Sequence, residues 1–224
     1  MLRHDLEQIV SAASAQGILA DINSNLLMLT KERAAGLVAA GVREVSASLY
    51  GTGTIHDKMT GQKGSFDRVL QGIDLCREAG IAVDVHGAIW NGMLHSVETL
   101  IYTVQKHNVS SITFFSLIPT ETWENDEEYL LTPGLAQEAI MQMRETFTIP
   151  IRTVGLRMPE EEECVMGNGI YGVGTDMRMK PCLLSRHIND SAGIDLRLYS
   201  LKEAISLLES QMEYGEWQAA CCPQ

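Results

Sequence analysis

Short apolar runs alternate with amphipathic stretches along the first 157 residues of this 224-residue chain. Between the runs, apolar residues recur every three to four positions, as they do on one face of a helix. Strands that alternate with helices in this way form parallel βα units. The sequence therefore predicts an α/β fold, either a barrel or an open sheet of parallel strands. The predicted strands are ILADI at 18–22, EVSASL at 44–49, IAVDVHGAI at 81–89, SITFFSLI at 111–118 and, more weakly, IPIRTVGL at 149–156.

Several predicted helices carry start signals as well as an apolar face. In the helix predicted over 65–79, Ser65 is a plausible N-cap, and Cys76 lies on the apolar face, where it reads as a buried residue and not as a ligand. Thr132 followed by Pro133 predicts another helix start, and Ser200 with Glu203 forms a capping box. Two further helices are predicted over 3–16, with Leu6, Ile9, Val10 and Ala13 on one face, and over 96–107.

Small and polar residues follow four of the predicted strands. These segments are 23–25, 50–53, 90–92 and 119–121. Right-handed crossovers bring the carboxyl ends of parallel strands to one rim, where both barrels and open sheets bind ligands. The sequence predicts a polar ligand at this rim, although each segment by itself is equally compatible with a simple turn.

Two pairs of histidine and aspartate lie close to strands. His56 and Asp57 follow the second predicted strand, whereas Asp84 and His86 lie two residues apart within the third and therefore share a face. A histidine beside a carboxylate serves as a general base or a metal ligand. The simpler interpretation, which we favour for both pairs, is a loop hydrogen bond for the first pair and a satisfied core histidine for the second. A metal-dependent isomerase or aldolase using Asp84, His86 and Glu121 is one hypothesis.

The chain changes character after residue 157 and becomes rich in glycine and cysteine. Cys164, Cys182, Cys221 and Cys222 supply enough thiolates for an iron–sulfur cluster or a zinc ion, or they are unrelated cysteines. GNGIYG at 167–172 satisfies G-x-G-x-x-G, yet no strand is predicted before it and no helix after it. A dinucleotide site needs both, so we do not predict one.

Composition narrows the classes of partner and compartment. The formal net charge of −12 argues against nucleic acid and anionic membranes, because phosphate binding needs clustered lysine and arginine. No apolar run is long enough to span a bilayer, and the first residues carry no signal-peptide core. The five cysteines are odd in number, and adjacent Cys221 and Cys222 do not suit a disulfide. We expect a cytoplasmic protein.

Three segments of the chain resemble the radical S-adenosylmethionine (radical SAM) superfamily, in particular its branch with a SPASM or twitch appendage, which includes peptide-modifying enzymes. They are DLEQIVSAASAQGILADINSNLLMLTKERAAGLVAAGVREVSASLYG, IHDKMTGQKGSFDRVLQGIDLCREAGIAV and ITFFSLIPT, roughly within 3–122. The resemblance implies a partial (β/α) barrel that binds SAM. In the family, a [4Fe–4S] cluster on a C-x-x-x-C-x-x-C triad cleaves SAM to a 5′-deoxyadenosyl radical.

The resemblance also implies roles for particular residues. Asn23 matches an asparagine at the end of the family's third strand, and Ser48 matches a position that contacts the ribose, with Gly51 following in the same loop. The backbone of Leu117 and Ile118 matches a region beside the adenine. In the appendage, Cys164 and Cys182 match the first two ligands of an auxiliary [4Fe–4S] cluster, and Cys221 or Cys222 matches a later one.

The departures from the family pattern set the remaining expectations. The sequence contains no C-x-x-x-C-x-x-C and no Gly-Gly-Glu, His86 stands where many members have arginine, and Met177 replaces a glycine. We therefore expect a barrel over 1–157 that lacks its first two βα units and exposes a sheet edge, with an appendage over 158–224.

These departures also limit the expected function. We expect that this chain alone does not cleave SAM. Its partners would be a peptide or small-molecule substrate and a polypeptide that supplies the missing amino-terminal segment. The alternative is a non-catalytic binding module or partner subunit built on the same scaffold.

Overall fold

The structure is a computed structural model that describes residues 3–116, 132–156, 169–182, 185–187, 193–213 and 217–219. The chain divides into two compact units, Met1–Pro159 and Glu160–Gln224. Each unit has its own cluster of buried apolar residues.

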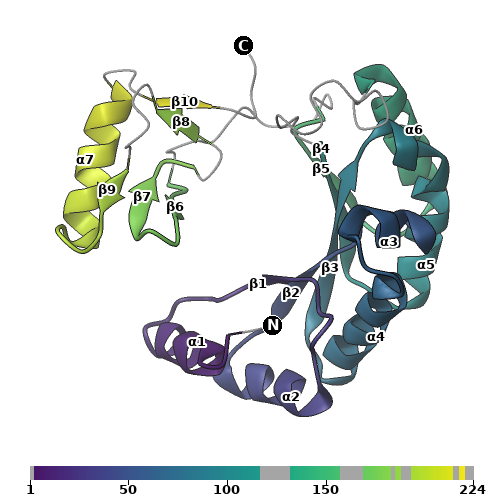
Figure 1. Cartoon of the computed structure of the whole chain (residues 1–224), viewed down its shortest axis with the longest axis horizontal. Helices are drawn as coiled ribbons and strands as arrows, with labels where there is room; N and C mark the ends of the chain where they lie inside the picture. Colours follow the sequence, from purple (N-terminus) through teal and green to yellow (C-terminus); the bar gives the residue numbers. More distant parts are fainter. Residues whose placement is uncertain are drawn as a thin grey trace. The chain divides into compact units, whose positions relative to one another are not determined.

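The first unit contains a five-stranded sheet in which the strands follow chain order, β1-β2-β3-β4-β5, and every neighbouring pair is parallel. The strands are β1 (Ile22–Ser24), β2 (Glu44–Ser48), β3 (Ala82–Ile89), β4 (Ser111–Ser116) and β5 (Ile151–Val154). The helices are α1 (Leu6–Ala15), α2 (Lys31–Ala40), α3 (Thr54–Thr60), α4 (Ser65–Glu78), α5 (Val97–Lys106) and α6 (Pro133–Thr146), with a 3-10 helix, η1 (Asn91–Ser96). The predicted parallel α/β fold is confirmed (Figure 1).

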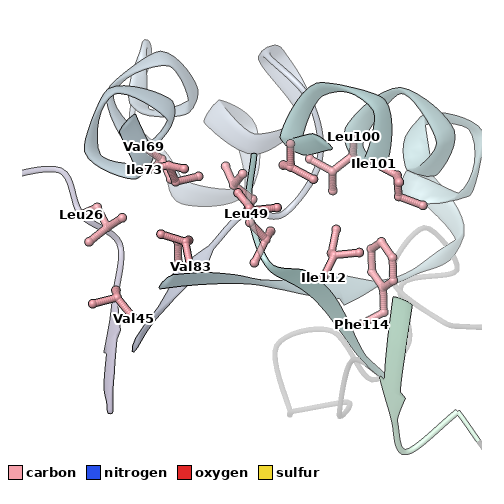
Figure 2. Close-up of a cluster of buried hydrophobic side chains, with 14 of the residues drawn as sticks. Leu26, Val45, Leu49, Val69, Ile73, Val83, Leu100, Ile101, Ile112 and Phe114 are labelled. Carbon is pink, nitrogen blue, oxygen red and sulfur yellow. The ribbon is translucent and has the colours of Figure 1, made fainter. Parts of the chain in front are cut away.

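The core of this unit lies between the sheet and helices α4 and α5. Because side chains alternate along a strand, every second residue of β2, β3 and β4 points toward these helices. Figure 2 shows Val83, Ile112 and Phe114 of the sheet facing Val69 and Leu100 of the helices, and all five are fully buried. Burying side chains of this size stabilises the fold by roughly 1.5–3 kcal/mol each.

Cys76 belongs to the same core, as the helical spacing predicts. Its side chain is fully buried on α4. Loss of solvent raises the pKa of the Cys76 thiol to about 11, because burial disfavours the thiolate. Cys76 is therefore a small apolar packing residue and not a metal ligand.

The first strand differs from its prediction. β1 comprises Ile22–Ser24 and not 18–22, and Ile18 and Leu19 are 58% and 87% exposed. The register explains the shift. Ile22 lies opposite Val45, the second residue of β2, so residues 18–20 extend past the amino end of β2, the one strand that pairs with β1 among the described residues. An apolar run without a partner strand has no ladder to join.

The helix starts are confirmed in part. Thr132 is the N-cap residue of α6, with Pro133 in the first turn. The capping box at α7 (Leu201–Glu213) is present, because the Ser200 N–H donates to Glu203 Oε2 at 2.9 Å and the Glu203 N–H donates to Ser200 Oγ at 3.4 Å. Ile9 is 45% exposed on α1, so it is not part of the predicted buried face. No helix in the described part of the chain is long and apolar enough to cross a membrane.

The second unit combines short antiparallel strands with one helix. Strands β6 (Gly172–Val173), β7 (Arg178–Lys180) and β9 (Ile194–Asp195) form one sheet, and β8 (Ser185–His187) pairs with β10 (Trp217–Ala219). The three-stranded sheet packs against α7 through the buried residues Met179, Ile194, Ala204 and Leu208. Gly172, the last glycine of G-x-G-x-x-G, starts a strand and not a helix, which agrees with the absence of a predicted dinucleotide site.

Candidate functional site

The sheet face opposite α4 and α5 carries polar side chains arranged in rows. We call it the polar face and define it by the residues of three rows. The first row is Asn23, Ser46, Asp84 and Ser111, the second is Ser48, His86, Thr113 and Arg152, and the third is Ala88, Phe115 and Val154. Residues opposite one another in register share a face, so each row crosses several strands at one height. The third row, nearest the carboxyl ends, is apolar.

Asp84 is the most buried charged residue of the polar face, at 4% exposure. Its carboxylate accepts hydrogen bonds from Ser111 Oγ at 2.8 Å and Thr113 Oγ1 at 2.9 Å, and it lies 3.0 Å from His86 Nε2. The Arg152 guanidinium approaches to 3.9 Å. Burial by itself raises the pKa of the Asp84 carboxyl, but the hydrogen bonds from His86, Ser111 and Thr113 outweigh it, and the pKa lies below its usual value. Asp84 is an anion at neutral pH.

His86 lies between the buried carboxylate and the open side of the polar face. Its side chain is 25% exposed, and its ring packs against Phe115 with the ring centroids 4.9 Å apart. Nε2 contacts Asp84, whereas Nδ1 has no hydrogen-bond partner within the described part of the chain. An imidazole held at one nitrogen and open at the other can exchange a proton with a ligand.

The histidine of the other pair, His56, lies on the short helix α3 and fixes the start of the segment that follows β2. The Tyr50 backbone N–H donates to His56 Nδ1 at 3.1 Å, and the His56 ring stacks on the Tyr50 ring with centroids 5.7 Å apart. His56 is only 2% exposed, and burial lowers the pKa of its imidazole. A neutral ring suits this position, because a protonated Nδ1 cannot accept the Tyr50 N–H.

Asp57, next to His56 in the sequence, caps the amino end of helix α4 from outside that helix. Its carboxylate accepts the backbone N–H groups of Gly64 at 2.5 Å and Phe66 at 3.0 Å, and the Ser65 hydroxyl at 3.0 Å. These bonds, led by the one from Phe66, lower the pKa of the Asp57 carboxyl. Ser65 is thus the first helical residue and not the predicted N-cap, which is Gly64. The His56–Asp57 pair therefore has a structural role, because its acceptor atoms make hydrogen bonds within the chain segment that follows β2.

Two of the predicted ligand-binding residues lie on the polar face. Asn23 is exposed on β1, and Ser48 is half-buried at the end of the neighbouring strand β2. Neither side chain has a hydrogen-bond partner among the residues that the structure describes, so both are available to a ligand. The structure shows where these residues lie and leaves their role as a prediction.

The remaining predicted site residues have different positions. Gly51 is buried with φ +134°, and a Cβ there would lie 2.5 Å from Ile55 Cγ2, so the tight turn itself requires glycine. Cys182 is half-buried in the second unit, just after β7. Leu117, Ile118, Cys164, Cys221 and Cys222 lie outside the described residues, as does Glu121. Within the described ranges, no three His, Cys, Asp or Glu side chains are grouped to hold a metal ion.

Several residues of the polar face were not predicted from the sequence. Ser46, Ser111, Thr113 and Arg152 join the site through strand register. A signal was available, because polar residues occupy alternate positions in three of the predicted strands. Which of them lie side by side depends on the register, and this is not readable from a single strand.

The first 95 residues of the chain match the sequence profile described as the radical SAM superfamily. The matched segment covers β1, β2 and β3, and thus includes Asn23, Ser48 and the Asp84–His86 pair.

Two curated proteins illustrate the sequence similarity of this chain to known proteins. The Fe-coproporphyrin III synthase of Methanosarcina barkeri is 29% identical over 117 residues, which is 52% of this chain and 29% of that protein. The AdoMet-dependent heme synthase of Nitratidesulfovibrio vulgaris is 27% identical over 121 residues, 54% of this chain and 33% of that protein. The matched part is therefore about a third of each relative's length.

Known structures share the fold at low sequence identity. Streptococcus suis SuiB matches with a TM-score of 0.73 at 11% identity, covering 94% of this chain and 54% of SuiB. Native anSMEcpe with bound AdoMet and the Cp18Cys peptide matches with a TM-score of 0.66 at 13% identity, covering 88% of this chain and 60% of that protein. The α/β fold of parallel strands is thus shared with these two proteins.

Proposed function

We propose that the polar face binds S-adenosylmethionine and that the chain is the carboxyl-terminal part of a radical SAM enzyme. The observation that carries the proposal is the pair of unpartnered side chains, Asn23 and Ser48, on adjacent strands of the segment that matches the radical SAM profile. Structures of SuiB and anSMEcpe with the same fold contain bound S-adenosylmethionine, which supports this ligand. The names of the heme synthase relatives support it as well.

The residues of the polar face fit the ligand's chemistry. S-adenosylmethionine presents ribose hydroxyls, an amino acid group and a flat adenine. The hydroxyl of Ser48 and the amide of Asn23 can donate and accept hydrogen bonds to such groups. The third row, Ala88, Phe115 and Val154, offers an apolar surface toward the carboxyl ends of the strands. When reductively cleaved, the bound cofactor supplies a 5′-deoxyadenosyl radical; the role of these side chains is to hold and orient it.

The cluster that cleaves SAM in this family does not fit the residues of this chain. The sequence has five cysteines and no C-x-x-x-C-x-x-C. Cys76 packs behind the sheet with its thiol pKa raised to about 11, and Cys182 belongs to the second unit. We therefore derive no step through that cluster, and we propose that another polypeptide segment contributes its three thiolates.

The second unit is proposed to be a SPASM-like or twitch-like appendage. Cys182, which follows β7, is one proposed ligand of an auxiliary [4Fe–4S] cluster, and Cys164, Cys221 and Cys222 are the further proposed ligands. The similarity to SuiB covers 94% of this chain and so extends into this unit, which supports the assignment. Iron and sulfide analysis of anaerobically purified protein tests it, and zinc in place of iron would contradict it.

Two substrate classes have support. The anSMEcpe and SuiB structures with bound peptides support a peptide substrate. The Fe-coproporphyrin III synthase and heme synthases support a tetrapyrrole or another small molecule. The alternative of a non-catalytic binding module or partner subunit is supported by the missing cysteine triad.

Equilibrium dialysis of the full chain with labelled S-adenosylmethionine tests the proposed function. We expect saturable binding that becomes about tenfold weaker in Ser48→Ala and in Asn23→Ala, the factor expected for one lost hydrogen bond. Ser110→Ala is the matched control, because Ser110 is exposed at the amino end of β4, away from the carboxyl rim. Equal affinity in all four proteins, or no binding in the wild type, would overturn the proposal.

A further inference from the structure

We infer that His86 and Asp84 form a proton-transfer site on the polar face for a substrate that carries an acidic O–H or N–H group. His86 is the catalytic residue, because its imidazole meets the substrate, and Asp84 is a positioning residue that acts through His86. The inference rests on the proposed function only in taking the polar face as the ligand-binding face, and it does not depend on which cofactor binds beside the substrate.

The first step of the argument is the burial of Asp84. A carboxylate at 4% exposure is costly to bury unless its oxygens are hydrogen-bonded, and here side chains of two strands supply the bonds, Ser111 and Thr113 from β4 and His86 from β3. Replacing such a buried polar network by apolar residues of similar size is often neutral for stability. Among the three side chains that hydrogen-bond Asp84, His86 is the one with a nitrogen that can take up a proton from a ligand.

The second step concerns the tautomer of His86. Asp84 is ionised and accepts only, so Nε2 of His86 carries the proton that is shared with Asp84 Oδ2. Nδ1 is then the nitrogen with a lone pair, and it has no partner in the described part of the chain. This is the arrangement in which a buried carboxylate fixes the tautomer of a catalytic imidazole and stabilises the imidazolium.

The proposed step is a simple proton transfer. The substrate O–H or N–H bond breaks, its electron pair stays on the substrate oxygen or nitrogen, and a new N–H bond forms at Nδ1 of His86. The imidazolium keeps its Nε2–H bond to Asp84, and the proton returns to the substrate or leaves to water in a later step. No oxidant or reductant takes part.

The surroundings of His86 suit a substrate that becomes an anion. Arg152 lies in the same row, its side chain is 62% exposed, and its guanidinium is 3.9 Å from Asp84. With strands about 4.8 Å apart, a ligand reaching from Ser48 across His86 to Arg152 spans roughly 14 Å. Its acidic group would lie between a proton acceptor and a fixed positive charge, and Phe115 would shield the imidazole on one side.

A second histidine–aspartate contact provides a matched control. His107 Nδ1 lies 2.7 Å from Asp74 Oδ1, and the His107 side chain is 25% exposed, the same as His86. Asp74, however, is 50% exposed on helix α4, away from the polar face. Water competes for the hydrogen bonds of an exposed carboxylate. Asp74 therefore fixes the His107 imidazole less firmly than a buried carboxylate would.

The test is the tautomer of His86 in the full chain, measured by two-bond ¹⁵N–¹H correlation spectra of ¹⁵N-histidine-labelled protein at pH 7.5. We expect a protonated Nε2 and a bare Nδ1 in the wild type, and a mixture of tautomers in Asp84→Asn, whose amide can donate as well as accept. Asp74→Asn should leave the His86 signal unchanged. A proton on Nδ1 of wild-type His86 overturns the inference, and this result does not depend on whether the variant folds.

A second measurement reports the reactivity of Nδ1. Diethyl pyrocarbonate, followed by peptide mapping, should modify His86 about tenfold more slowly in Asp84→Asn than in the wild type, the factor of one lost charge-assisted hydrogen bond. Asp74→Asn should leave this rate unchanged. Equal rates in wild type and Asp84→Asn overturn the inference. If the protein fails to bind S-adenosylmethionine while its His86 still reacts at a rate that depends on Asp84, that result would support the inference and contradict the proposed function. The two failures are therefore distinguishable.

Discussion

The chain contains two histidine–aspartate pairs close to strands, and the structure gives them opposite uses. His56 and Asp57 lie on the short helix α3, in the glycine-rich segment after β2, whereas Asp84 and His86 lie within β3. Segments that follow strands are the usual place for a ligand site, and strand interiors are the usual place for core residues. The pair on α3 is nevertheless structural, and the strand pair lies on the polar face with a free imidazole nitrogen.

The difference lies in the partners of the polar atoms. His56 and Asp57 accept backbone N–H groups, from Tyr50 and from the first turn of α4, so their lone pairs are already used in fixing the chain. Asp84 is bonded by side chains only, and through His86 it presents a nitrogen to the outside. A polar pair is therefore a better candidate for a ligand site when its acceptor atoms are not already hydrogen-bonded to backbone N–H groups, wherever it lies in the sequence.

The largest expected effect is on folding stability at His56. We expect His56→Ala to lower the free energy of unfolding by about 4 kcal/mol, because the variant loses a buried ring and leaves the Tyr50 N–H without its acceptor. His86→Ala should cost about 2 kcal/mol, because the His86 ring is partly exposed but the buried Asp84 carboxylate loses one hydrogen bond. Urea unfolding of both variants measures the difference, and a larger loss in His86→Ala would break the comparison.

A smaller effect is expected at Asp84. Asp84→Val should cost about 2–3 kcal/mol in urea unfolding, because the Ser111 and Thr113 hydroxyls are left buried without an acceptor. Combining it with Ser111→Ala and Thr113→Val should recover most of that loss, since replacing a whole buried polar network by apolar residues is close to neutral. Full recovery of stability would show that folding does not require the polar network, which would support a role for it in the site. A triple variant no more stable than Asp84→Val would show that the network is needed for folding.

Local pattern predicted much of the fold. The 3.6-residue period of 65–79 and 96–107 identified α4 and α5 and their buried faces, and the capping box identified the start of α7. These features depend on residues within one or two helical turns of each other, so sequence spacing alone determines them. The parallel sheet followed from the order of elements.

Features that depend on pairing between distant segments were beyond the sequence. The true bounds of β1 depend on where β2 begins, and the cap of α4 comes from Asp57, seven to nine residues earlier. The polar face required the register of all five strands, which places Arg152 of β5 in the row of Ser48 of β2. A one-residue change in any register would have moved these side chains to the other face.

The smallest expected effect is a pH dependence at His56, and it sharpens the comparison because it arises only from the structural pair. Burial holds the pKa of His56 below its usual value, whereas in the unfolded chain the ring titrates near about 6.5. The unfolded state therefore binds more protons as the pH falls, so the stability that the neutral ring provides is present above this pH and is lost on acidification.

The measurement is urea unfolding of wild type and His56→Asn between pH 8 and pH 5.5. The Asn side-chain oxygen can still accept the Tyr50 N–H but does not titrate. The charged group beside the ring is Asp57, whose own pKa is held low and which therefore stays ionised throughout this range. We expect the wild type to be the more stable protein at pH 8 and its advantage to shrink steadily toward pH 5.5. An advantage that stays constant across this range would mean that His56 is not held neutral by burial, and that its bond to Tyr50 does not distinguish it from His86.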